Sequence, residues 1–72
     1  MSQDAVRVVR HIAGCDNGPC PNWYELSDRD FMFQGEEVTD PDVLAGIEVA
    51  PGEKFIRVPR DLILKGIGQV PR

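Results

Sequence analysis

The chain has 72 residues, of which 42% are hydrophobic and 28% are charged, and its formal net charge is −4. A polypeptide of this length buries only about 60% of the surface that its unfolded form exposes, which excludes a large enzyme with a deep, enclosed substrate cavity. Its apolar runs fall far short of the ~20 residues that cross a bilayer, and its first residues lack the apolar stretch of a signal peptide. We therefore expect one small cytosolic domain without membrane association, in which segments 1–4 and 68–72 are loose.

The charge is distributed unevenly along the chain. Residues 16–53 contain ten acids and one base, a net charge of −9, whereas residues 54–72 carry a net charge of +4. A negative field of this kind repels phosphates, which argues against a nucleic-acid partner and favours a protein partner with a basic surface. The alternative is that acids collect on the solvated turns of a small domain.

A first strand is predicted over residues 5–12, which are rich in β-branched side chains. Alternation along a strand would place Val6, Val8 and Ile12 on one face. Arg10 interrupts that face, because its charge would lie among apolar side chains.

A loop and a hairpin follow the first strand. Glycines and prolines over residues 14–22 exclude regular structure, since proline removes a backbone donor and glycine favours turns. Residues 23–26 and 31–34 flank a polar turn and predict a β-hairpin. Gly35 is expected to bulge or bend the second strand, which could resume through Val38.

The second half of the chain predicts two short helices around one further strand. A capping acid before a proline indicates a helix over residues 41–45, and a proline-glycine pair indicates a type II turn over residues 50–53. Residues 54–58 predict a strand, and a second helix is expected over residues 60–65, with Gly66 as its C-terminal cap. Together these elements predict an α+β fold, a small antiparallel sheet of three to four strands with two short helices on one face.

All imidazole and thiol groups of the chain lie within ten residues, in the spacing His11-x3-Cys15-x4-Cys20. Cytosolic thiols are normally reduced, so free thiols, metal ligands or a transient redox pair are expected before a structural disulfide. A zinc site would need a fourth ligand such as Asp16, and the gap between the cysteines is wide for one. A redox site would need a stabilised thiolate, which the carboxylate of Asp16 opposes. The third interpretation is that both cysteines pack around a tight loop as small apolar residues, or join on air oxidation.

The predicted hairpin carries four of the five aromatic residues, which are Trp23, Tyr24, Phe31 and Phe33. These rings could all build the core of a small domain. Alternatively, some of them lie exposed beside acids and anchor a partner. The residues predicted to bind the partner on this second interpretation are Trp23, Tyr24, Asp28, Asp30, Glu36 and Glu37.

No sequence motif of a known enzyme mechanism occurs in the chain, and the neighbouring acids do not form an acid and base couple. We therefore expect a non-enzymatic protein-interaction or regulatory module without a cofactor. The alternative is a small zinc-binding or thiol-redox protein that uses His11, Cys15 and Cys20. A further alternative is an acidic inhibitor that mimics DNA, which the basic residues after Glu53 disfavour.

Turn and capping motifs give the chain a resemblance to a known group of proteins. They are residues 14–21 followed by Trp23-Tyr24, then Phe33-Gln34-Gly35, Val38-Thr39-Asp40-Pro41, Pro51-Gly52-Glu53 and Val58-Pro59-Arg60. In these motifs the chain resembles small uncharacterised actinobacterial proteins with a Cys-containing N-terminal loop, over residues 14–64. The resemblance implies a small intracellular accessory protein of bacteria, associated with helix-turn-helix regulators, and it assigns no functional residue.

Overall fold

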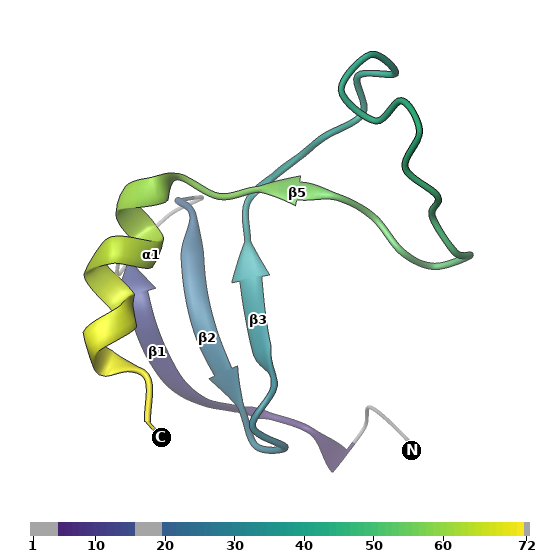
Figure 1. Ribbon diagram of the computed structural model, residues 1–72. Helices are drawn as coiled ribbons and strands as arrows, with labels where there is room; N and C mark the ends of the chain where they lie inside the picture. Colours follow the sequence, from purple (N-terminus) through teal and green to yellow (C-terminus); the bar gives the residue numbers. More distant parts are fainter. Residues whose placement is uncertain (1–4, 16–19, 72) are drawn as a thin grey trace.

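The computed structural model describes residues 5–15 and 20–71 and confirms an α+β fold with a small antiparallel sheet (Figure 1). Three antiparallel strands lie in the order β1 (Val8–Gly14), β2 (Asn22–Leu26) and β3 (Phe31–Gln34). A separate two-stranded ladder pairs β4 (Glu36–Glu37) with β5 (Ile56–Arg57). The described chain ends in the helix α1 (Arg60–Gly66) and the 3-10 turn η2 (Ile67–Gln69).

The hairpin of β2 and β3 forms where the sequence predicts it. At its turn, the N–H of Leu26 donates to the carbonyl of Asp30 at 2.8 Å, and the N–H of Arg29 donates to the carbonyl of Leu26 at 3.0 Å. Arg29 adopts the left-handed conformation, with φ of 77°. This is the common three-residue connection in which a type I turn is followed by a bulge. It fixes Leu26 and Asp30 as the first hydrogen-bonded pair of the ladder.

The first strand is shifted and bulged relative to the prediction. Its pairing with β2 shifts register between Val8 and Arg10, and again between His11 and Ala13. Each irregularity moves the following side chains to the other face of the sheet. Val8 and Ile12, which were predicted to share a face, therefore lie on opposite faces, Val8 exposed and Ile12 buried.

The predicted helix over residues 41–45 is absent. Asp40 does cap a turn, because its Oδ1 accepts the N–H of Asp42 at 2.9 Å and its carbonyl accepts those of Val43 and Leu44 at 3.1 Å. This segment belongs to the long loop between β4 and β5, which projects away from the sheet in Figure 1. With Val43 exposed there, no packing surface extends the single turn into a helix.

The turn predicted over residues 50–53 is present, with Gly52 in the left-handed region at φ of 85°. The strand predicted over residues 54–58 is reduced to the two residues of β5, since its only partner strand is equally short. Gly35 separates β3 from β4, so the strand is interrupted there and resumes over Glu36–Glu37 in the second ladder. The carbonyl of Arg57 lies so close to Gly35 that no side chain fits between them.

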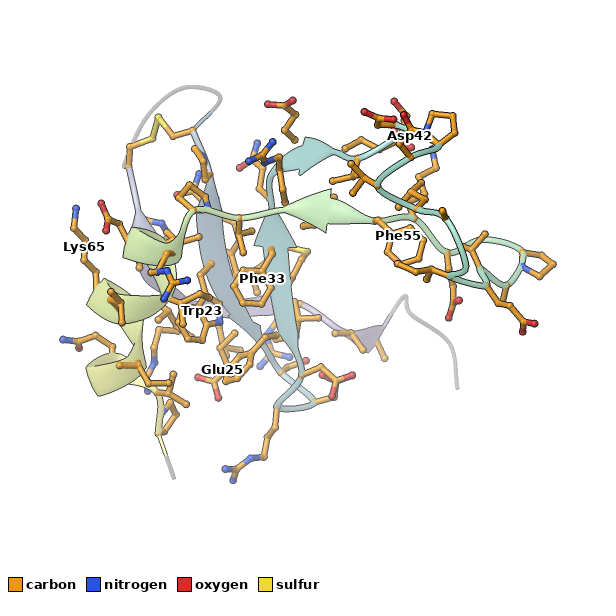
Figure 2. All side chains as sticks on the ribbon, turned by 45° about the horizontal axis from the view of Figure 1, so that its top comes forward. Trp23, Glu25, Phe33, Asp42, Phe55 and Lys65 are labelled. Carbon is orange, nitrogen blue, oxygen red and sulfur yellow. A yellow bond between two sulfur atoms is a disulfide. The ribbon has the colours of Figure 1, made fainter. Side chains whose placement is uncertain are left out.

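One helix covers one face of the sheet and encloses a small core. The buried apolar side chains of the described residues are Ile12, Trp23 and Leu62, and the indole of Trp23 stacks on Phe33 with ring centroids 5.1 Å apart (Figure 2). Gly66 was predicted to cap the helix, but it lies within α1 and rests on the indole. A Cβ at this position would lie 2.6 Å from Cε3 and 2.7 Å from Cζ3 of Trp23, so only a hydrogen atom fits.

Two residues of the C-terminal segment, which was expected to be loose, contact the rest of the domain. The guanidinium Nη1 of Arg10 donates to the carbonyl of Gln69 at 3.4 Å, and the partly buried Val70 packs against the core. Residues 1–4 and Arg72, which were also expected to be loose, lie outside the described residues.

The contact between Gly66 and the indole predicts the effect of adding one methyl group. Gly66→Ala should lower the free energy of unfolding by about 1–3 kcal/mol, because the methyl must displace the ring or the helix. A Cβ at Gly68 meets no atom within 4 Å. The matched variant Gly68→Ala should therefore be neutral or more stable by about 0.5 kcal/mol. Urea unfolding followed by tryptophan fluorescence measures both, and equal stabilities would contradict the contact.

Candidate functional site

Two of the six residues predicted to bind a partner lie largely out of reach. Trp23 is 3% exposed, and its ring contacts Phe33 and the edge of Phe31, with centroids 5.3 Å apart in the second contact. Its indole therefore belongs to the core and not to a partner surface. The buried Nε1–H has no hydrogen-bond acceptor among the described residues. Tyr24 is half-buried on the other face of the sheet, where its ring lies 5.1 Å from that of His11.

The four acids predicted to bind a partner are all exposed and flank β3. Asp28 and Asp30 lie in the turn before β3, and the Oδ1 of Asp28 accepts the N–H of Asp30 at 3.0 Å. Glu36 and Glu37 form β4, directly after β3. We call β3 together with these four acids the β3 edge.

Two hollows lie at the ends of the β3 edge. One is lined by Val6, Leu26, Asp28, Asp30, Phe31 and Met32, and the other by Cys20, Pro21, Gln34, Gly35 and Glu36. Each combines apolar groups with at least one carboxylate. Such an arrangement suits a lysine or arginine side chain, whose stem is aliphatic and whose end is cationic.

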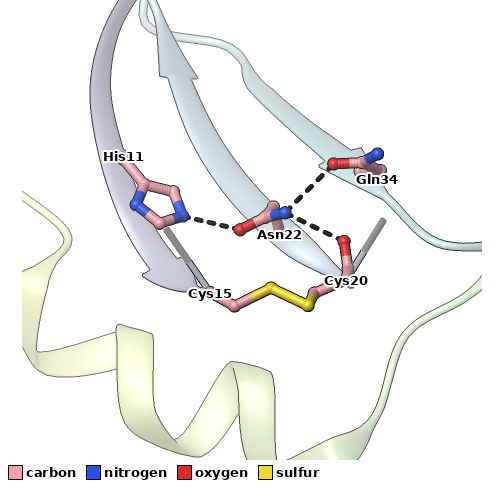
Figure 3. The surroundings of a disulfide bond; sticks show 5 residues. All are labelled: His11, Cys15, Cys20, Asn22 and Gln34. Carbon is pink, nitrogen blue, oxygen red and sulfur yellow. Dashed lines mark hydrogen bonds between the residues drawn. A yellow bond between two sulfur atoms is a disulfide. The ribbon is translucent and has the colours of Figure 1, made fainter. Parts of the chain in front are cut away.

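Cys15 and Cys20 form a disulfide in the structure, with their Cα atoms 5.9 Å apart (Figure 3). Gly14 and Asn22 are the last pair of the ladder between β1 and β2, so the cysteines just beyond it are brought within bonding range. The reduced thiols expected from the sequence are thus not the state observed. The bond is the oxidised form of the third interpretation given above, in which the two cysteines bracket a tight loop.

A buried amide lies beside the disulfide. Asn22 is 2% exposed, and its Nδ2 donates to the carbonyl of Cys20 at 2.9 Å and to Oε1 of Gln34 at 3.0 Å (Figure 3). Its Oδ1 lies 2.7 Å from Nε2 of His11. Since the Cys20 carbonyl requires the amide nitrogen on its side, Oδ1 is the acceptor and Nε2 of His11 carries the donated proton.

This network bears on the alternative of a zinc site at His11, Cys15 and Cys20. Two sulfurs bonded to each other are not thiolate ligands, and a protonated Nε2 has no lone pair for a metal. Within residues 5–15 and 20–71, no three His, Cys, Asp or Glu side chains are grouped so that they could hold a metal ion. Asp16, the fourth ligand considered from the sequence, lies outside the described residues.

Asn22 and Gln34 form a hydrogen-bonded polar pair at the candidate site that was not predicted from the sequence. Asn22 was assigned to the loop, whereas it begins β2 and faces Gln34 across the hairpin. The signal was the symmetry of the hairpin, because both amides lie four residues beyond the first hydrogen-bonded pair. Equal spacing from the turn places them on the same face of the sheet.

No family model matches this chain, and neither a curated protein nor a solved structure matches it. In the part of the chain that the structure describes, every helix is too short or too polar to cross a bilayer. A function is therefore inferred from the β3 edge and from the surroundings of the disulfide.

The hydrogen bonds of Asn22 predict a difference between two truncations. Asn22→Ala removes three hydrogen bonds from a buried site and should lower the free energy of unfolding by about 2–3 kcal/mol. The matched variant Gln34→Ala removes one bond at an exposed residue and should cost less than about 1 kcal/mol. Urea unfolding of both variants gives the comparison. An Asn22→Ala protein as stable as the Gln34→Ala protein would contradict the network.

Proposed function

We propose that this protein is a non-enzymatic protein-interaction module that binds a partner with a basic surface. The observation that carries the proposal is the composition of the β3 edge. Phe31 and Met32 are 42% and 41% exposed, and exposed carboxylates flank them at both ends of the strand. An apolar centre with a charged rim is the usual composition of a binding surface. Phe31 and Met32 thus take the anchoring role that the sequence analysis gave to Trp23 and Tyr24.

The charge of the surface supports a basic partner. Residues 28–53 contain eight acids and one base, and all eight acids are exposed. Such a field accelerates the encounter with a cationic partner and weakens as salt increases. The same field repels phosphates, so we do not propose a nucleic-acid partner. A DNA mimic would leave the exposed Phe31 and Met32 without a role.

The distribution of apolar side chains supports binding as well. Only three large apolar side chains among the described residues are buried, whereas ten are exposed. Three of the exposed ones, Val43, Ile47 and Val49, lie on the loop between β4 and β5. Exposed apolar side chains mark a binding surface where they are contiguous, as Phe31 and Met32 are at the hollow that both of them line.

The zinc or thiol-redox alternative has less support, because Asn22 engages the Nε2 of His11 and the described residues hold no group of three side chains that could bind a metal ion. We propose the cytosol as the location, and there the reducing systems would open the disulfide. The strand pairs of the sheet do not include either cysteine, so the β3 edge does not require the bond.

A capture experiment tests the proposal. The immobilised protein should recover basic proteins from a cell lysate at about 50 mM salt and release them at about 300 mM, where screening is stronger. The neutralised variant is Asp28→Asn, Asp30→Asn, Glu36→Gln and Glu37→Gln. It should lose most of the recovered proteins, because the rim of the β3 edge has lost its charge.

The control removes the same charge elsewhere. It carries Asp42→Asn, Glu48→Gln, Glu53→Gln and Asp61→Asn, all at exposed positions. This control should retain most of the recovered proteins. Empty captures at low salt, or equal losses in the two variants, would contradict the proposed binding surface.

A further inference from the structure

We propose that β3 binds an extended, lysine- or arginine-rich segment of a partner as a fourth strand of the sheet. This inference rests on the proposed function, and it specifies which atoms make the contact. The partner would bind to a row of backbone N–H and carbonyl groups on β3, and acidic side chains lie at each end of this row.

The register of the hairpin exposes backbone groups on the outer side of β3. From the Leu26–Asp30 pair, hydrogen-bonded pairs fall on every second residue, so the backbone of Met32 bonds to β2. Phe31 and Phe33 therefore direct their N–H and carbonyl groups away from β2. β3 is an outer strand of the sheet, and none of the described residues bonds to these four groups. They form a template for one more strand.

The other outer strand is protected in ways that β3 is not. β1 has two register shifts and carries the basic Arg10 together with His11, and both features discourage the addition of a strand. β3 pairs without a register shift, and none of its four residues is charged or a proline. Among the described strands of this sheet, the unprotected edge thus lies on the acidic side of the hairpin.

The core holds this edge in its extended conformation. Trp23 contacts the ring of Phe31 edge-on at 5.3 Å and stacks on that of Phe33 at 5.1 Å. Because the strand is ordered before binding, a partner segment loses less conformational entropy on adding to it. Trp23 is therefore a positioning residue for the edge, although it is buried.

The charges at the edge select the partner. Residues 28–37 contain four acids and one base, and Arg57, opposite Glu36 in the β4–β5 ladder, is a second base nearby. A second copy of the chain, paired antiparallel, would bring Asp28 and Asp30 against Glu36 and Glu37. Like charges at this spacing oppose pairing, whereas a basic segment is attracted in either strand direction.

The two hollows define the spacing within the bound segment. One hollow lies at the turn that carries Asp28 and Asp30, and the other lies where β3 passes into β4 at Glu36. The two hollows are therefore at opposite ends of β3. Asp30 and Glu36 are six residues apart, about 20 Å in an extended chain. The segment should therefore carry basic residues on both sides of about five residues that form the strand.

Hydrogen exchange of the protein with a peptide tests the inference. The probe is a peptide of about ten residues that alternates valine and threonine between paired lysines. Binding should slow the exchange of the Phe31 and Phe33 amides by at least about tenfold. The Met32 amide, which is bonded within the sheet, serves as the internal control and should change less.

Two control peptides separate charge from strand addition. A peptide with glutamates in place of the lysines should not bind. A peptide that keeps the lysines but has prolines at alternate positions should bind at least about tenfold more weakly, because it lacks N–H donors. The neutralised variant of the β3 edge should lose about tenfold in affinity for the lysine peptide, and the charge-matched control should lose much less.

The outcomes distinguish the two proposals. Binding of the lysine peptide without protection of Phe31 and Phe33, or equal binding of the proline peptide, would overturn strand addition and leave the interaction module standing. Capture of basic proteins without peptide binding would do the same. Concentration-dependent protection of both amides without peptide would identify a second copy as the occupant and overturn the basic partner. Failure of both the capture and the peptide would overturn the proposed function itself.

Discussion

Gly66 brings the backbone of α1 onto the ring of Trp23, and this contact joins the C-terminal helix to the sheet. The same indole stacks on Phe33 and touches Phe31, so it connects β2, β3 and α1. Ile12 and Leu62 complete the buried group. With so few buried side chains, the domain depends on the indole to an unusual degree, and its buried Nε1–H lacks an acceptor among the described residues. Burial of the large ring outweighs the cost of that one group.

The sequence predicts the elements that local chemistry specifies. The hairpin follows from a polar turn between two aromatic runs, the turn at Gly52 from its proline-glycine pair, and α1 from the proline at its start. These signals act over a few residues, so no knowledge of the partner elements is needed. The positions of Asp28 and Asp30 in the turn were predicted for a similar reason, because exposed turns carry their own sequence signature.

Other features depend on contacts between elements that are distant in the sequence, and local sequence patterns do not predict such contacts. The register shift between Val8 and Arg10 arises from the pairing of β1 with β2, and it places Val8 and Ile12 on opposite faces of the sheet. The turn at Asp40 has the chemistry of a helix start but no surface on which a helix could pack. Trp23 could have been an anchor or a core residue, and only the position of Gly66 decides between them. The turn sets the register of the hairpin, and the register decides that the backbone groups of Phe31 and Phe33 point outward. The alternation of apolar and polar residues in the sequence does not reveal this register.

The two sides of the sheet have different roles, and this difference links the fold to the proposed function. The helix side of the sheet holds the chain together, whereas the outer edge of β3, between two groups of acids, has no backbone partner among the described residues. The most direct test of this account is the proton NMR spectrum of Gly66. We predict that the ring current of Trp23 separates the resonances of its two α-protons widely, because one of them points toward Cε3 and Cζ3 of the indole. Two α-proton resonances near those of an unfolded glycine would show that the helix does not rest on the indole, and would contradict the account.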